Sequence, residues 1–414
     1  MQREILHCDL NNFYASVECL YNPRIRELPV AVCGSVELRH GIVLAKNMAA
    51  KACGVKTGEP VWAAKRKCAN LVVVPPNRER YLSMSASARA IYERHSGFVE
   101  SFGIDECWLD VTGSPEPGGG EQIAERIRRE IREELGITVS VGVSYNKIFA
   151  KMGSDYKKPD AVTVITRQNY RELLWPLPVR ELLFVGRATE SKLHTMGLYT
   201  IGQLAGCDPA YLMHRLGKNG YMLWLFSNGR DESAVMPSDY VDEPKSVGNS
   251  MTLPRDITSR REAEVTLTLL ADSVAKRLRR ARKVARIIQV SVKDNELFSR
   301  EYESLLPEPS ASAAALTACA AGLFGARYQW ERPVRAMGLR AVELLDEDTP
   351  VQLDLEQYAR SQLRQEKIER SMDEIRRRFG VRAITRGCLL DGSVTGTISP
   401  ADDNIVHPVA FRKR

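Results

Sequence analysis

Three acidic residues stand inside apolar, strand-forming stretches of the chain. Asp9 follows the strand-like run 5–8, and Asp105 and Glu106 are neighbours within the otherwise apolar segment 103–111. A buried carboxylate is costly unless it is paired or binds a metal ion, and adjacent carboxylates repel each other. Oxygen ligands of this kind favour Mg²⁺ or Mn²⁺ over zinc. Three carboxylates can hold two metal ions about 3.5–4 Å apart, an arrangement that serves phosphoryl transfer.

Each of these acids also has a simpler interpretation. Asp9 can cap a helix that begins in the residues after it. Asp105 and Glu106 can lie in a solvent-exposed turn between two strands. Cationic side chains should line the tail of a polyphosphate substrate, and Lys51 and Lys158 are candidates, although each can equally be an ordinary surface charge. The residues alone therefore leave two alternatives, a metal site for a polyanion and a set of structural acids.

Two further segments carry features that are typical of nucleic-acid binding. Residues 276–286 include seven cations among eleven residues and no acid, whereas a solvated helix face usually mixes signs. Interpreted as a helix, this run suits the phosphate backbone of DNA, and an ordinary charged surface helix is the alternative. Residues 182–193 suggest a helix–turn–helix pair, in which backbone amides near Val185, Gly186 and Arg187 can meet a phosphate. Many helical hairpins share this second pattern.

The elements that must position these residues follow from hydrophobic periodicity. Short β-rich runs alternate with helical patterns over the first 165 residues, which predicts a mixed α/β domain. The predicted strands are 5–8, 30–33, 42–44, 71–74 and 138–143; the predicted helices are 80–95 and 121–135, with a loop at 113–120.

The β signal is lost after about residue 167 and returns beyond a linker. The polar, acidic stretch 231–244 contains two prolines and has the composition of an interdomain linker. Helices are predicted at 182–193 and 198–204 before it, and a second α/β unit over 245–345 after it. That unit contains helix 260–283, strand 287–292, helix 311–324 and strand 334–344, and a charged helix at 356–378 follows it.

Composition limits the class of protein. The 414 residues are 44% hydrophobic and 27% charged, with a formal charge of +7, which is ordinary for a globular protein of several domains. The nine cysteines form no C-x-x-C pair, which predicts neither a zinc site nor disulfides and fits the cytoplasm. No apolar stretch reaches about 18 residues and the N-terminus does not resemble a signal peptide, so we expect no membrane association. We expect a monomer.

Several motifs together resemble those of the Y-family DNA polymerases, the translesion enzymes. Residues 8–18 resemble the family's first motif, 104–110 its second carboxylate motif and 140–151 its third; 41–58, 184–193 and 245–250 also match, in the family's order. The resemblance covers about residues 4–345 and is closest to the bacterial DNA polymerase IV branch.

The resemblance implies a multidomain α/β fold arranged as a right hand. An α/β palm would carry the carboxylates, beside small fingers, a helical thumb with a helix–hairpin–helix, and an α/β little finger that binds DNA. By position, the palm is 1–20 and 78–166, the fingers 21–77, the thumb 167–232, the linker 233–244, the little finger 245–345 and the tail 346–414.

The resemblance also assigns roles to single residues. Asp9, Asp105 and Glu106, with the backbone carbonyl of Leu10, would be the catalytic centre and hold two Mg²⁺ ions, for which Mn²⁺ can substitute. Tyr14 corresponds to a steric gate that excludes a ribose 2′-hydroxyl; without the resemblance we would interpret it as a core aromatic. The implied nucleotide contacts are Phe13, Tyr14, Met48, Lys51 and Lys158, and the implied DNA contacts are Val185, Gly186, Arg187, Arg279, Arg280 and Arg282.

The fingers depart from the family's pattern. Relatives usually present a hydroxyl residue, a tyrosine and an arginine to the triphosphate, where this chain has Ala45, Met48 and Lys51. Each lost hydrogen bond to a charged group costs about 1.5–3 kcal/mol, or roughly ten- to a hundredfold in nucleotide use. No metal ligand is lost, so we expect an active but slow polymerase.

The tail holds a short segment that resembles a sliding-clamp peptide. Gln352, Leu353, Asp354 and Leu355 resemble the glutamine-leucine peptide with which bacterial polymerases dock on the clamp. An acidic linker before the charged helix is the alternative interpretation.

The sequence therefore predicts a template-directed DNA polymerase of the translesion type. It would add dNTPs to a primer 3′-hydroxyl on primer–template DNA, with low fidelity and without proofreading, in DNA repair and damage tolerance. One alternative is a palm-fold nucleotidyl cyclase, which would need neither the thumb hairpin nor the basic segment. The other is a catalytically weakened or non-catalytic DNA-binding homologue, against which the three intact carboxylates argue.

Overall fold

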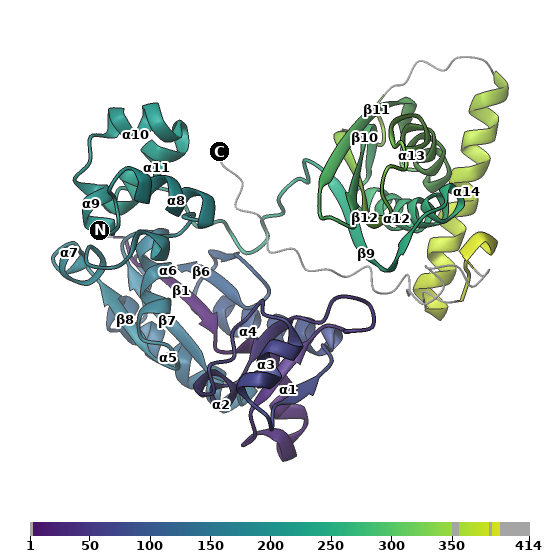
Figure 1. The fold of residues 1–414 in the computed structure, drawn as a ribbon. Coiled ribbons are helices and arrows are strands. Elements are labelled where there is room, and N and C mark those ends of the chain that lie inside the picture. The colour runs from purple at the N-terminus through teal and green to yellow at the C-terminus, as the bar shows by residue number, and fades with distance from the viewer. Residues whose placement is uncertain (1–2, 350–355, 381–382, 390–414) are drawn as a thin grey trace. The chain divides into compact units, whose positions relative to one another are not determined.

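The computed structural model describes residues 3–349, 356–380 and 383–389. The chain divides into two compact units (Figure 1). Of the described residues, one unit comprises 3–34 and 42–241, and the other comprises 35–41 and those between 242 and 389. Both combine sheets with helices, so the multidomain α/β class is confirmed.

The first unit is built on a five-stranded sheet with the order β5-β6-β1-β7-β8. At its centre, β1 (Ile5–Leu10) pairs antiparallel with β6 (Glu106–Asp110) and with β7 (Val139–Ser144). The outer strands are β5 (Val99–Ser101) and β8 (Val162–Ile165). Every residue of β1 is buried, which explains why this strand reads as a continuous apolar run interrupted only by His7 and Asp9.

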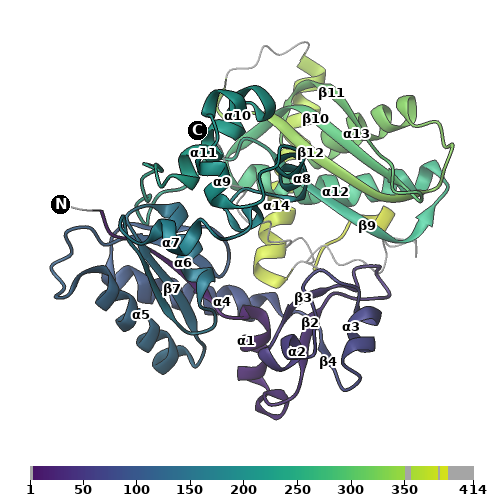
Figure 2. The same ribbon diagram turned by 60° about the vertical axis from the view of Figure 1, so that its left-hand side comes forward.

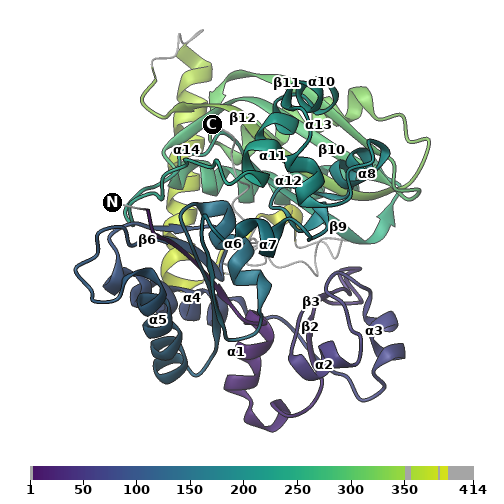
Figure 3. The same ribbon diagram turned by 90° about the vertical axis from the view of Figure 1, so that its left-hand side faces the viewer.

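Helices cover both faces of this sheet (Figure 3). On one face, α1 (Phe13–Tyr21), α4 (Arg78–His95) and α5 (Gly119–Leu135) share a hydrophobic core with the strands. On the other face lies α6 (Lys147–Tyr156), which begins at the cap residue Asn146. The helical spacing that predicts α5 comes from three fully buried residues on its inner side, Ile123, Ile127 and Ile131.

The segment predicted as the fingers, 21–77, contains a small three-stranded sheet with the order β3-β2-β4, visible as a separate lobe in Figure 2. Its strands match the predicted ones closely, and two helices that were not predicted, α2 and α3, pack on it. The bounds are β2 Val30–Cys33, β3 Val43–Lys46, β4 Val72–Val74, α2 Met48–Ala52 and α3 Val61–Lys67, after the short 3-10 helix η1 Pro23–Ile25.

The thumb is helical, but its hairpin begins later than predicted. The prediction of a helix from residue 182 is wrong: Leu182 is extended, Phe184 has φ 73° and Gly186 is the extended N-cap of α8. The next helix starts at Ile201, where Thr200 and Gln203 form a capping box. The bounds are α7 Tyr170–Leu174, η2 Val179–Glu181, α8 Arg187–Thr195, α9 Ile201–Ala205, α10 Pro209–Leu216 and α11 Lys218–Ser227.

Part of the predicted linker belongs to the palm. Val235 is 3% exposed and lies in a cluster with Ile5, Trp108 and Ala150. The amide of Met236 donates to Glu100 (3.0 Å), and that of Ser238 donates to the carbonyl of Gly97 (3.0 Å). The polar composition of this stretch conceals one apolar anchor and several backbone hydrogen bonds.

The second unit has a four-stranded antiparallel sheet with the order β11-β10-β12-β9, and two helices share its core. Two strands, β9 and β11, were missed because their exposed residues do not alternate regularly with buried ones. The bounds are β9 Val247–Ile257, α12 Arg260–Arg280, β10 Lys283–Asp294, β11 Ser299–Ser310, α13 Ala313–Arg327 and β12 Val334–Asp346.

A long C-terminal helix, α14 (Glu356–Phe379), runs beside α12 and α13 in Figure 1 and is followed by the 3-10 turn η3 (Gly387–Leu389). Leu389 packs against Val265 and Leu269 of α12. Although α14 has 24 residues, it is highly charged. Within the described ranges, no helix combines the length and the apolar composition that a membrane span requires.

Candidate active site

The three carboxylates converge where β1 and β6 meet. Asp9 lies directly opposite Glu106 in the antiparallel register, and the amide of Leu10 donates to the carbonyl of Asp105 (3.0 Å). Because side chains alternate along a strand, Asp9 shares its face of the sheet with Ile5 and therefore faces α6. Burial, together with the charges of Asp9 and Glu106, raises the pKa of Asp105 to about 7. Asp105 does lie in the bend between β5 and β6, as the alternative interpretation had it, but both acids are only partly exposed.

Two ammonium groups lie among these carboxylates. Lys151 Nζ is 2.9 Å from Asp9 Oδ2 and 3.1 Å from Glu106 Oε1, and Lys158 Nζ is 2.6 Å from the same Asp9 oxygen. Both lysines also pair with Asp155. Burial opposes the charge of Lys151, but the carboxylates around it hold its pKa above the usual value.

Sequence reasoning missed Lys151, although the residue stands inside the third motif. Lys147 and Lys151 are four residues apart and hence on one face of α6, which was the available signal. Lys147 is also occupied: its Nζ binds Glu100 at 2.7 Å and lies 4.4 Å from the ring centroid of Trp108.

The donor set fits a divalent metal by its chemistry. It consists of carboxylate oxygens, and Glu106 Oε2 has no hydrogen-bond partner in the described part of the chain, with His7 Nε2 3.5 Å away. In the same described ranges no three acidic, histidine or cysteine side chains are gathered as a ready-made metal cage. The two lysines balance the carboxylates instead, so a metal ion would compete with ammonium groups for Asp9 and Glu106.

Tyr14 lies on the first turn of α1, beside the carboxylates. Its ring stacks on that of Tyr81, with 4.2 Å between centroids and 10° between planes. Tyr81 donates its hydroxyl to the buried Glu18 (2.8 Å), which also pairs with Arg80 (2.9 Å). Burial raises the pKa of Tyr14, and the nearby charge of Asp105 adds to this rise. Stacking on Tyr81, whose hydroxyl is held by Glu18, thus fixes the plane of the Tyr14 ring.

The other proposed nucleotide contacts differ in how exposed their side chains are. The Phe13 ring is buried in the palm core, so only its backbone can face a ligand. Met48 is 44% exposed on α2, and Lys51 is exposed on the same helix. Ala45 lies on the neighbouring strand β3. Lys51 takes part in no ion pair among the described residues, so its ammonium group is available.

The proposed DNA contacts of the thumb lie at the start of α8. Gly186 is the N-cap residue, Val185 before it is buried, and Arg187 after it is exposed. A backbone that enters a helix in this way leaves amide groups without intrahelical partners. The segment can therefore offer donors to a phosphate.

The basic segment 276–286 is not one helix, which corrects the prediction. Its first half ends α12 at Arg280, Arg282 has φ 53°, and Lys283 begins β10. Arg279 donates to Glu369 (2.8 Å) and Asp373 (2.8 Å) of α14, and Arg282 pairs with Glu347 (2.7 Å). Arg280 is exposed, and no ion pair in the described structure engages it. The run of cations therefore serves mainly the protein itself.

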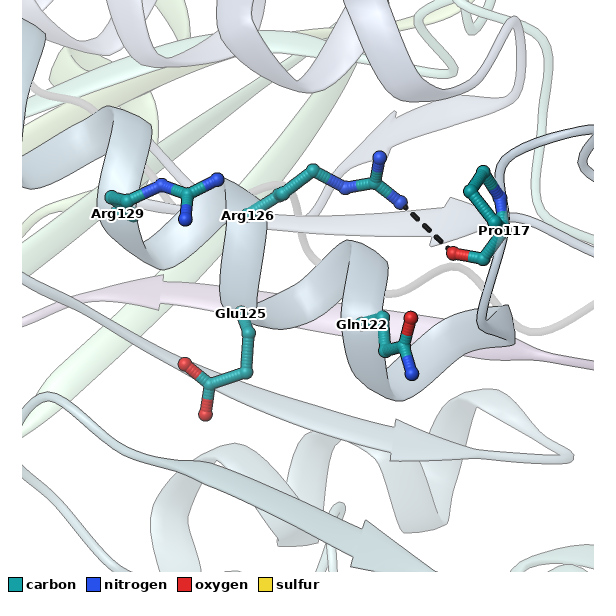
Figure 4. Close-up of a pocket in the computed structure, with 5 residues that line it drawn as sticks. All are labelled: Pro117, Gln122, Glu125, Arg126 and Arg129. Atoms are coloured by element: carbon teal, nitrogen blue, oxygen red, sulfur yellow. Dashed lines mark hydrogen bonds between the residues drawn. The ribbon is translucent and has the colours of Figure 1, made fainter.

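Two other features of the chain do not contribute to this site. The proposed clamp peptide Gln352–Leu355 lies outside the described residues. Figure 4 shows a hollow on α5, where Arg126 donates to the carbonyl of Pro117 (3.2 Å). It is lined by none of the residues discussed above, its lining being Pro117, Gln122, Glu125, Arg126 and Arg129.

The chain is similar to proteins of known family over most of its length. Residues 8–155 match the impB/mucB/samB family, and residues 244–355 match the C-terminal domain of that family. A DNA polymerase IV of Acetivibrio thermocellus is 50% identical over 391 residues, covering 94% of this chain and 98% of the relative. A DNA polymerase IV of Moorella thermoacetica is 38% identical, covering 94% of this chain and 96% of the relative.

A solved structure shares the fold. A Y-family DNA polymerase chimera matches with a TM-score of 0.73 and 24% identity, covering 83% of this chain and 99% of the other. These similarities do not favour a nucleotidyl cyclase or a non-catalytic homologue. Together with the converging carboxylates, they establish that the chain belongs to the impB/mucB/samB family and is a translesion DNA polymerase.

Proposed function

We propose that Asp9, Asp105 and Glu106 are the catalytic centre at which a dNTP is joined to a primer 3′-hydroxyl. Membership of a DNA polymerase family implies dependence on a divalent metal. We assign two Mg²⁺ ions, with Mn²⁺ as a substitute, because the donors are all oxygen and the carbonyl of Leu10 extends the set. When bound, such ions make the 3′-hydroxyl more acidic and stabilise charge on the phosphates. The observation that carries the proposal is the bridging of Asp9 and Glu106 by Lys151.

In this proposal one lysine binds the triphosphate, and the other compensates the negative charge of the carboxylates. Lys158 is the more exposed of the two, with 30% of its side chain accessible against 11% for Lys151. We therefore assign Lys158 to the triphosphate, together with the Phe13 amide. Lys151, which is held by Asp9, Glu106 and Asp155, stays with the carboxylates and limits their mutual repulsion.

Tyr14 acts as the sugar gate in the same proposal. A ring fixed by stacking on Tyr81 is a rigid floor, and a rigid floor discriminates against an added 2′-hydroxyl by sterics. Tyr14→Ala should raise the incorporation of ribonucleotides relative to deoxynucleotides, measured as the ratio of single-insertion efficiencies. An unchanged ratio would remove Tyr14 from the gate.

The fingers should make nucleotide use weak. Met48 and Lys51 replace a hydroxyl donor and a bidentate fork, and Ala45 offers no donor at all. Lys51 retains a free positive charge for the triphosphate. Because these contacts with the triphosphate are lost, we expect the apparent affinity for dNTPs to be low and primer extension to be slow at low dNTP concentration.

The remaining partners follow from the same proposal. Val185, Gly186 and Arg187 of the thumb and Arg280 of the little finger would contact the primer–template backbone. Arg282 would reach DNA only by leaving Glu347, and Arg279 only by leaving α14. We propose that the protein works as a monomer in the cytoplasm, with the peptide Gln352–Leu355 as its contact with the sliding clamp.

Primer extension tests the proposal directly. The parent, Asp105→Ala and Met48→Tyr/Lys51→Arg should be compared on an undamaged template with Mg²⁺ and with Mn²⁺. We expect Asp105→Ala to abolish extension while DNA binding stays normal, and the double variant to gain about ten- to a hundredfold at limiting dNTP. Glu133→Ala, an exposed acid on α5, is the matched control and should change nothing. Extension by Asp105→Ala at the parent's rate would contradict the assignment of the centre.

A further inference from the structure

Arg78, the first residue of α4, has an unusual shortage of partners. Its Nε and Nη1 atoms are buried and make no hydrogen bond to any part of the chain that the structure describes. Arg78 as a whole is only half-buried, but a donor atom that has lost contact with water and gained no partner is costly. Two donor atoms of Arg78 are therefore left for an acceptor that the described chain does not provide.

The neighbouring arginine shows that this shortage is specific. Arg80, two residues further along α4, binds Glu18 at 2.9 Å. Farther along the same helix, Arg89 donates to Ser101 (2.7 Å), and Arg94 donates to Glu134 (2.8 Å). Arg78 is therefore the exception among the arginines of α4.

The position of Arg78 identifies what it can meet. Arg78 and Tyr81 are three residues apart and so lie on one face of α4, and Tyr81 stacks on the proposed sugar gate Tyr14. Burial lowers the pKa of Arg78, while the charge of Tyr14 acts in the opposite direction. Burial and the charge of Asp105 raise the pKa of Tyr14, and the charge of Arg78 lowers it.

We propose that Arg78 donates a hydrogen bond to the minor-groove edge of the base pair that forms at the active site, which makes it a specificity-determining residue. This inference rests on the proposed role of Tyr14 beneath the sugar. The sugar and the N3 or O2 atom of its base lie on the same, minor-groove side of a nucleotide. A hydrogen-bond donor beside the Tyr14 ring, above which the sugar would lie, therefore faces those base atoms.

The chemistry of this edge explains why an arginine suits a polymerase that copies any sequence. Every Watson–Crick pair presents the acceptors N3 of a purine and O2 of a pyrimidine in its minor groove. A donor directed at them accepts all four pairs but responds to their geometry, since a mispair displaces these atoms. Arg78 would supply a charged hydrogen bond in a site whose fingers have lost donors at Ala45 and Met48.

The test uses bases that lack the acceptor. Single insertions of dATP and of 3-deaza-dATP, in which C–H replaces N3, should be compared for the parent and for Arg78→Ala; the same comparison should be made with 3-deazaadenine in the template. We expect the parent to lose about ten- to a hundredfold on one of the two substitutions. Arg78→Ala should lose a similar factor on natural DNA and show no further loss with the analogue.

Two variants control for general damage to the site. Arg78→Lys keeps the charge and should recover part of the sensitivity to the analogue. Arg94→Ala removes an arginine at the far end of α4 and should leave the parent's sensitivity intact. Equal sensitivity of the parent and Arg78→Ala at both positions would overturn the inference. The proposed function is reported separately by the parent's insertion of dATP, which does not depend on the analogue.

Discussion

Charged side chains gather in two places in this polymerase, and the two gatherings differ in how far the protein satisfies them. In the palm, Asp9, Glu106 and Lys151 are paired, but Glu106 Oε2 and the Arg78 donors have no hydrogen-bond partner in the described chain, and Asp105 has a raised pKa. In the second unit, Glu369 of α14 is 1% exposed and fully engaged. Its partners are Arg279, Arg386 and the amides of Ala313 and Ala314.

The difference separates charges that hold the fold from charges that await a ligand. Glu369 caps the start of α13 and ties α12 to α14, so each of its oxygens has a structural partner. Asp272 plays a similar part for Arg376 (2.7 Å) and Arg386 (3.1 Å). An ionic network is a poor indicator of function by itself. Asp373 Oδ1 and Arg376 Nη2 of the second network also lack a hydrogen-bond partner among the described residues, so the two networks differ in degree and in the raised pKa of Asp105.

Removing Glu369 should break the finished network and have the largest effect. Glu369→Ala removes one acidic partner from each of two arginines, Arg279 and Arg386, which keep Asp373 and Asp272, and breaking a buried pair costs about 3–5 kcal/mol. We expect this loss in the unfolding free energy of the little finger, measured by denaturant titration with tryptophan fluorescence and limited proteolysis. Glu374→Ala, an exposed acid on the same helix, should leave stability unchanged. Equal stabilities of the two variants would contradict a structural role for the network.

Removing Lys151 from the carboxylates of the palm should strengthen the binding of a ligand, the Mg²⁺ ion. Because its ammonium group competes with a metal for Asp9 and Glu106, Lys151→Met should lower the Mg²⁺ concentration for half-maximal binding about tenfold, or ~1.4 kcal/mol. Calorimetric titration of Mg²⁺ into the DNA-free protein measures this directly. Lys157→Met, at an exposed neighbouring position, serves as the control. A higher Mg²⁺ requirement in the Lys151 variant would show that Lys151 assists the metal instead of competing with it.

Stability in the absence of metal should depend on pH through Asp105. Its pKa of about 7 in the folded protein lies above the ordinary value, so folding favours the protonated form. The stabilisation is complete below about pH 4 and is lost as the pH rises through 7. In EDTA, the melting temperature should therefore fall between pH 6 and pH 8 by more in the parent than in Asp105→Asn. Identical pH slopes would mean that Asp105 does not titrate in this range.

The smallest effect is expected for DNA binding by the little finger. Arg280→Ala should weaken DNA binding modestly and reduce the slope of log affinity against log salt concentration by about 1, the signature of one lost phosphate contact. Arg279→Ala should instead destabilise the fold, since its partners are Glu369 and Asp373. An unchanged salt slope for Arg280→Ala, measured by fluorescence anisotropy, would remove this residue from the DNA surface.

Much of the palm could be predicted because its acidic residues are recognisable from their immediate sequence neighbours. Asp9 and the pair Asp105–Glu106 interrupt apolar strands, and an acid in such a place is visible in the sequence itself. The pairing of β1 with β6 then brings them together. Lys151 could not be placed in the same way, because its contact with Asp9 depends on how α6 packs over the sheet.

The basic segment shows the opposite case. Seven cations among eleven residues suggest a surface, but the acids that neutralise Arg279 lie about ninety residues later, in α14. Local periodicity carries no information about such distant pairing. Local periodicity also did not reveal the break at Arg282, where the backbone is left-handed between the end of α12 and the start of β10.

The docked start of the linker limits how far the two units can separate. The chain is held to the palm as far as Ser238, and the little finger begins at Val247, so the nine intervening steps span at most about 30 Å. A tether of this length keeps a second DNA-binding surface at an effective concentration of the order of millimolar. If the first unit binds a duplex as proposed, a contact as weak as that of one arginine with one phosphate contributes to binding, because the short linker makes the second contact an intramolecular one.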